Sequence, residues 1–146
     1  MGKDFRVLTG CCVAVIAALL VVGAVSHGVI RHIVQTSPLW IGVALGYRRS
    51  PLTKWVALPC LVFWLLVMTA IWIFLLGWAR IVSGTFSPTE IAMTMVVGMA
   101  SITGIVRAAG MRSGVRMWSA IATTLLIGAS QVATFRLSFL PQIAHR

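Results

Sequence analysis

The hydrophobic pattern of this chain consists of long apolar runs that are separated by short polar segments. A helix needs about 20 largely apolar residues to cross the hydrocarbon layer of a membrane. Four runs come close to this length or exceed it, and they predict transmembrane helices over residues 7–26, 55–79, 88–107 and 117–135. The run at 55–79 predicts its helix most strongly, because it is the longest and contains no charged residue.

Polar start signals support these helices. Ser87-Pro88-Thr89-Glu90 supplies a capping Ser, a Pro at the first helical position and a Glu three residues after the Ser. This is a capping box, and it predicts where the third helix begins. Ser50-Pro51 marks the second helix in the same way, and Ser37-Pro38 is compatible with the start of another short helix.

The segment between the first two predicted helices does not fit a simple span. Polar residues occupy much of 27–35, and the apolar stretch that follows is too short to cross a membrane. We therefore expect an interfacial or re-entrant segment over 38–47, anchored by Trp40 and Tyr47. The alternative is that the first helix continues to about Val34. The predicted fold class is all-α: one membrane domain over 1–146, with a four-helix transmembrane bundle.

The composition agrees with a membrane protein. Hydrophobic residues make up 60% of the chain and charged residues only 10%, whereas soluble domains carry about 25% charged residues. The net charge of +10 does not predict nucleic-acid binding, because the basic residues lie between apolar runs. Such positions fit topology signals and contacts with anionic lipid headgroups. The residues concerned are Arg48, Arg49, Lys54, Arg107, Arg112 and Arg116.

The distribution of these charges also predicts an orientation. With four spans, the two inter-helix regions that contain these residues share one side, and together with Arg31 they hold seven of the twelve Lys and Arg residues. Positive residues concentrate on the cytoplasmic side. We therefore expect a protein of the bacterial inner membrane with both termini on the non-cytoplasmic side. The alternative is that Ala24-Val25-Ser26 is a signal-peptidase site, which would leave three helices.

Small residues recur at every fourth position in three of the predicted helices. Small faces let helix backbones approach closely where lipid provides no hydrophobic drive. They predict close packing of the first, third and fourth spans. The residues are Gly10, Ala14 and Ala18, then Ala100, Gly104 and Ala108, and finally Ala120, Thr124 and Gly128.

Glu90 and Gln131 are the candidate polar transport residues. The chain is similar in size to the small multidrug transporters, and that resemblance implies an acidic residue within the membrane, for which Glu90 is the candidate. The helix cap explains Glu90 equally well. Gln131 is the most polar residue well inside a predicted helix, and it either lines a polar site or bonds to a neighbouring helix.

Cys11 and Cys12 form the third candidate site. Adjacent cysteines in a first transmembrane helix resemble those of the bacterial mercuric-ion transporters, and this resemblance implies soft-metal handling. It covers two residues only, because Cys60 is the one other cysteine and no second pair exists. The other interpretation is that both thiols pack as small apolar groups.

The sequence contains no motif that predicts enzyme chemistry or a cofactor. We expect a non-catalytic accessory or interaction subunit whose partners are lipids, other membrane proteins or a second copy. The alternative is a small transporter or channel that works as an oligomer.

Overall fold

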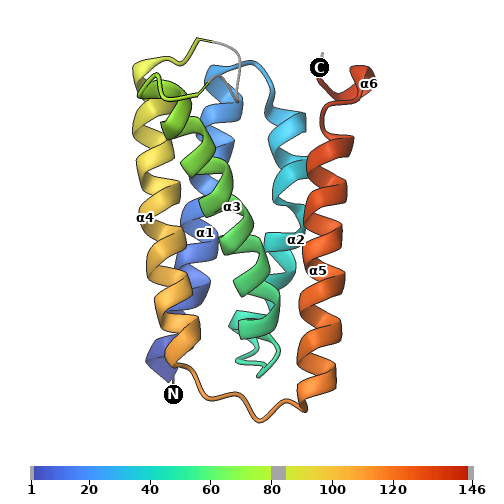
Figure 1. Cartoon of the computed structure of the whole chain (residues 1–146). Helices are drawn as coiled ribbons and strands as arrows, with labels where there is room; N and C mark the ends of the chain where they lie inside the picture. The colour runs from blue at the N-terminus through green and yellow to red at the C-terminus, as the bar shows by residue number, and fades with distance from the viewer. Residues whose placement is uncertain (1, 80–84, 145–146) are drawn as a thin grey trace.

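The apolar runs of the sequence fold as helices in the computed structural model, which describes residues 2–79 and 85–144 (Figure 1). No strand occurs in these two ranges. The helices are α1 (Gly2–Val25), α2 (Val29–Tyr47), α3 (Thr53–Leu75), α4 (Pro88–Gly110), α5 (Met117–Leu137) and the short α6 (Pro141–Ala144). The four predicted spans correspond to α1, α3, α4 and α5, and each of these is long and apolar enough to cross a membrane.

The segment predicted at 38–47 is not a separate element. It is the second half of α2, a helix of 19 residues that begins at Val29. The alternative prediction fails as well, because α1 ends at Val25 and a turn follows in which His27 adopts a positive φ of 54°. Ser37-Pro38 therefore lies inside a helix and does not start one. The hydropathy pattern did not predict the first half of α2 as part of the bundle, because this half is polar. Its side chains His32, Gln35 and Thr36 are nevertheless buried against other helices.

The α1–α2 pair approaches closely at both of its ends, and a glycine stands at each close point. A Cβ on Gly23 would lie 3.0 Å from Nδ1 of His32. A Cβ on Gly46 would collide with Oγ1 of Thr9. Glycine lets the helices approach closely at both positions, and at Gly46 the partner helix occupies the space that a side chain would need.

Two helices contain an internal proline, and a hydroxyl group compensates for each. A proline lacks the N–H that would bond to the carbonyl four residues earlier. For Pro38 that carbonyl belongs to Val34, and Oγ of Ser37 donates to it at 2.8 Å. For Pro59 it belongs to Trp55, and Oγ1 of Thr124 lies 3.5 Å away on α5. Side-chain hydroxyls of this kind allow proline inside helices in an apolar environment.

The five long helices run alternately up and down, so the chain begins and ends at opposite ends of the bundle (Figure 1). α1 packs against α2 and α4, while α3 packs against α2, α4 and α5. The residues of the core come mainly from α1 and α3, and those of α3 form one stripe along that helix. The core residues of that stripe are Val56, Ala57, Cys60, Leu61, Trp64 and Met68.

Candidate functional site

A polar cavity of about 710 Å³ lies in the half of the bundle nearer the C-terminus. Side chains from all five long helices line it, and charged, polar and aromatic groups stand among the apolar ones. Its polar and aromatic lining residues include Ser26, Arg31, His32, Gln35, Trp64, Thr85, Phe86, Glu90, Thr94, Phe135 and Phe139. The deepest of the aromatic groups is Trp64, which stands eleven residues before the end of α3, or about 16 Å along the helix axis.

The first two turns of α2 place three polar side chains on the cavity wall. Arg31, His32 and Gln35 follow the tight turn after α1, and their spacing puts them on adjoining faces of one helix. The ring Nδ1 of His32 lies 2.9 Å from the carbonyl oxygen of Gly28. Because a carbonyl can only accept, Nδ1 carries the hydrogen and the neutral ring keeps Nε2 as an acceptor.

Arg31 and Trp64 each present a buried N–H group without a partner in the described part of the chain. The guanidinium of Arg31 stacks over the ring of Phe139 at 4.2 Å, and its Nε is buried without a hydrogen bond. Trp64 is only 2% exposed, and its indole Nε1 likewise has no acceptor. A buried donor left without a partner is destabilising, by about 1–3 kcal/mol. These two donors are therefore the chemically unsatisfied part of the cavity wall.

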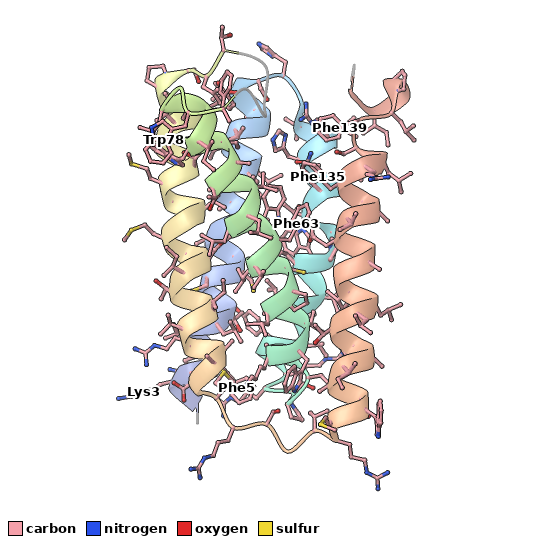
Figure 2. The ribbon with its side chains drawn as sticks, in the orientation of Figure 1. Lys3, Phe5, Phe63, Trp78, Phe135 and Phe139 are labelled. Carbon is pink, nitrogen blue, oxygen red and sulfur yellow. The ribbon has the colours of Figure 1, made fainter. Side chains whose placement is uncertain are left out.

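An aromatic cluster forms the wall on the side of α5. Phe135 meets Phe63 edge-on at 5.2 Å between ring centroids and meets Phe139 at the same distance. Trp64 lies 6.3 Å from Phe135 in a similar arrangement. Figure 2 shows Phe63, Phe135 and Phe139 gathered in this half of the bundle, between α3 and α5. The cluster gives the cavity an apolar face that adjoins Arg31 at Phe139.

Glu90 both caps α4 and lines the cavity. Its Oε2 accepts from the backbone N–H of Ser87 at 2.7 Å, and Oγ of Ser87 accepts from the N–H of Glu90 at 3.3 Å. The predicted capping box is thus confirmed. The carboxylate accepts one of these two hydrogen bonds and lies at the helix N-terminus, where the backbone favours a negative charge.

Gln131 is not a lining residue of this cavity but joins α5 to α2. Its Nε2 donates to the backbone oxygen of Gln35 at 2.9 Å, and Nε2 of Gln35 donates to Oγ of Ser138 at 2.9 Å. All three side chains are buried. The structure thus brings Glu90 to the cavity and gives Gln131 an inter-helix hydrogen bond instead.

The predicted small-residue faces divide into buried and open positions. Ala18, Gly104, Ala108 and Ala120 are buried between helices. A Cβ on Gly104 would crowd Cβ of Cys11 at 3.2 Å. Thr124 and Gly128 face α3, where Thr124 approaches Trp55 and Gly128 approaches Pro59. Gly10, Ala14 and Ala100 instead line a shallow apolar groove between α1 and α4.

The three cysteines are buried and free, and they lie among apolar side chains. Among the described residues, no group of three or more His, Cys, Asp or Glu side chains is placed to hold a metal ion. The resemblance to the mercuric-ion transporters therefore gains no second ligand set from the structure.

The predicted basic residues gather at the N-terminal end of the bundle. They sit in the α2–α3 and α4–α5 connections and in the adjoining helix turns (Figure 1). Nζ of Lys54 donates to the carbonyl of Met111 at 2.7 Å, and Nε1 of Trp55 donates to Oγ of Ser113 at 2.9 Å. Figure 2 shows Lys3 at this same end. The two connections are thereby held against each other.

Sequence reasoning missed Arg31, His32 and Trp64 as members of one site. The polar residues of 27–35 were left outside the predicted spans, and nothing in the apolar run at 55–79 singled out Trp64. One signal was present: His32 and Gln35 are three residues apart, and Leu39 follows four residues later, which places them on one helix face.

Comparison with protein-family models, with curated proteins and with solved structures found no match to this chain.

Proposed function

We propose that this protein spans the membrane five times and binds a small solute in the polar cavity, as a small transporter does. The fifth span is α2. Its 19 residues cover about 28 Å at 1.5 Å per residue, close to the hydrocarbon thickness of about 30 Å. Its polar side chains at His32, Gln35 and Thr36 are buried in the bundle and so would be shielded from lipid.

Five spans favour an orientation different from the one that four spans predict. Eight of the twelve Lys and Arg residues belong to the end of the bundle that carries the N-terminus. They are Lys3, Arg6, Arg48, Arg49, Lys54, Arg107, Arg112 and Arg116. At the other end, the described residues contribute Arg31 and Arg136. The positive-inside bias therefore supports a cytoplasmic N-terminus and a C-terminus outside.

The same basic end suits the anionic headgroups of the cytoplasmic leaflet. Arg49 and Arg112 line a pocket of about 380 Å³ together with Phe5 and Met111. Each Lys or Arg near such a surface contributes about 1 kcal/mol of attraction. We propose that this end is fixed against the lipid surface while the cavity faces the opposite side.

One observation carries the solute-binding proposal: a cavity inside the described bundle has Arg31, His32 and Glu90 on a wall that is otherwise mainly apolar. Ionisable groups within a membrane domain are energetically unfavourable, and they generally mark substrate or ion pathways. The volume of about 710 Å³ falls within the range of sites for small organic molecules, about 300–1,000 Å³. Glu90 also caps α4 and His32 bonds to Gly28, so Arg31 is the ionisable group of this wall that the packing of the helices explains least.

Cysteine labelling tests whether water reaches this cavity. Ala70 lines it, and the neighbouring Thr69 is exposed on the outer surface of α3 at nearly the same depth. Ala70→Cys should react with a membrane-impermeant maleimide added from the C-terminal side of sealed vesicles. Thr69→Cys is the matched control and should react slowly, because lipid covers it.

The unchanged protein gives the background, since its three cysteines are buried. Equal, slow labelling at both positions would mean that the cavity is dry, and the solute-binding proposal would fail.

An accessory subunit remains the second candidate, and the shallow groove between α1 and α4 favours it. Gly10 has open space where a side chain would stand, and it lines the groove with Ala14 and Met99. Small residues on an open face suit a helix from another membrane protein. Gly10→Cys should form a disulfide or maleimide cross-link to that partner in intact membranes. Gly98→Cys should form no such cross-link, because position 98 also has open space but lies outside the groove. Absence of any cross-link at position 10 would contradict the role as an accessory subunit.

A further inference from the structure

In the described part of the chain, the fully buried side-chain atoms of the cavity wall that lack a hydrogen bond are all donors. Nε of Arg31 and Nε1 of Trp64 are donors, and both are buried without an acceptor among the residues that the structure describes. The one acid on the wall, Glu90, already accepts a backbone N–H. Nδ1 of His32 is also engaged, with Gly28. The wall still carries acceptors at Nε2 of His32 and on Glu90, but neither bonds to the two buried donors, so a bound solute can supply the acceptor that these donors lack.

The two donors differ in what they contribute. Arg31 keeps its positive charge in proteins and offers a planar fork that matches a carboxylate. Trp64 offers one neutral N–H from a side chain that is fixed by the aromatic cluster and only 2% exposed. An anion inside a low-dielectric site needs both a countercharge and hydrogen bonds. The guanidinium of Arg31 can supply both the countercharge and hydrogen bonds, and Trp64 adds a second donor elsewhere on the wall of the same cavity.

The aromatic wall next to Arg31 suggests the other half of the solute. Phe135 and Phe139 form an edge-to-face aromatic surface, and Phe139 also carries the guanidinium of Arg31 at 4.2 Å. An aromatic or other apolar group packs well against such a surface. The charged and apolar walls are thus joined at Phe139, so one small molecule can contact both.

We propose that the cavity binds a small organic anion, with its carboxylate at Arg31, an apolar group against Phe135 and Phe139, and Trp64 as a second donor to the solute deeper in the cavity. This inference rests on the solute-binding function proposed above and specifies its ligand class. A cationic solute would instead use Glu90, and a neutral one would need neither charge. The charge of the ligand therefore separates the three cases.

A matched set of three probes tests the charge preference. Hydrocinnamate, hydrocinnamamide and phenylpropylamine share one phenylpropyl skeleton and carry a negative, a neutral and a positive group at neutral pH. Their binding to the protein in lipid nanodiscs is measured by titration calorimetry, with empty nanodiscs subtracted. Hydrocinnamate should bind at least about tenfold more tightly than the other two, since a hydrogen bond to a charged group is worth about that factor or more.

Variants then identify which side chains cause the preference for the anionic probe. Arg31→Gln removes the charge and should weaken hydrocinnamate binding by about tenfold or more, without a matching loss for hydrocinnamamide. Trp64→Phe keeps an aromatic ring, removes the N–H, and should weaken hydrocinnamate binding by a smaller factor. Arg136→Gln is the control, because Arg136 is exposed near the same end but does not line the cavity. It should leave all three affinities unchanged.

The outcomes separate this inference from the function on which it rests. Preference for the amine, equal binding of all three probes, or no binding would overturn the anion proposal. If Ala70→Cys still labels from the aqueous side, the solute-binding function survives that result. If Ala70→Cys is unreactive as well, both proposals fail. The probe series uses the unchanged protein, so it gives an answer even where a variant does not fold.

Discussion

Replacement of Gln131 distinguishes an inter-helix hydrogen bond from a functional polar site. Gln131 is fully buried; its Nε2 donates to the carbonyl of Gln35, while its Oε1 has no partner in the described structure. The two atoms therefore act in opposite directions on the free energy of unfolding. Hydrogen bonds between helices in membranes contribute about 0.6 kcal/mol on average and at most about 1.7 kcal/mol. A buried acceptor without a partner is destabilising, by about 1–3 kcal/mol.

Gln131→Leu removes both atoms and keeps most of the side-chain volume. The loss of the hydrogen bond and the relief of the unpaired oxygen nearly cancel, so the unfolding free energy should change by less than about 1 kcal/mol. Gln131→Ala also removes both atoms, but it leaves an empty space and should destabilise by about 2–4 kcal/mol. Ser138→Ala is a third case, because it leaves the amide of Gln35 without its acceptor and should be destabilising by about 1–3 kcal/mol.

Unfolding in mixed micelles of mild and denaturing detergent, followed by circular dichroism, measures these differences. We expect the unfolding free energy of Gln131→Leu to be close to that of the unchanged protein and that of Gln131→Ala to be far lower. If Gln131→Leu proves as unstable as Gln131→Ala, the amide itself is essential and the reasoning from its two atoms is refuted. If a stable Gln131→Leu protein no longer binds solute, Gln131 is part of the functional site.

Three further variants test the packing. Gly46→Ala should destabilise by about 1–3 kcal/mol, because the new methyl collides with Thr9; Thr9→Ala should restore much of the loss, and an additive double variant would contradict the contact. Ser87→Ala should cost about 1 kcal/mol by removing the cap of α4, and unaltered thermal unfolding would count against the capping box. Pro59→Ala gives the carbonyl of Trp55 a backbone donor, so Thr124→Val should matter less in that background; equal effects in both backgrounds would show that the hydroxyl does not compensate for the proline.

The length and apolar character of α1, α3, α4 and α5 could be predicted from the sequence, because each holds an apolar run near the required length. The start of α4 could be predicted as well, since the capping box is a local signal from Ser87 to Glu90. α2 could not. Its first half carries Arg31, His32 and Gln35, and hydropathy treats such residues as exposed, whereas here the other helices surround them.

The candidate site was only partly predictable for the same reason. Glu90 was identified from its own sequence context, but its neighbours in the cavity come from helices far away in the chain. Trp64 shows the difficulty, since nothing local distinguishes it from Trp78, yet the first is 2% exposed and the second 78% exposed. Which face of an all-apolar helix is buried depends on its partners, and the sequence of one helix does not contain that information.

The number of spans is the point on which the orientation, the shielding of α2 and the sidedness of the cavity all depend. Reporter tags at the two termini, probed separately from each side of sealed vesicles, measure it directly. Five spans predict that the N-terminal tag is protected on the cytoplasmic side while the C-terminal tag is accessible from outside. Both tags on one side would mean that α2 does not cross, and the account of the cavity would then be wrong.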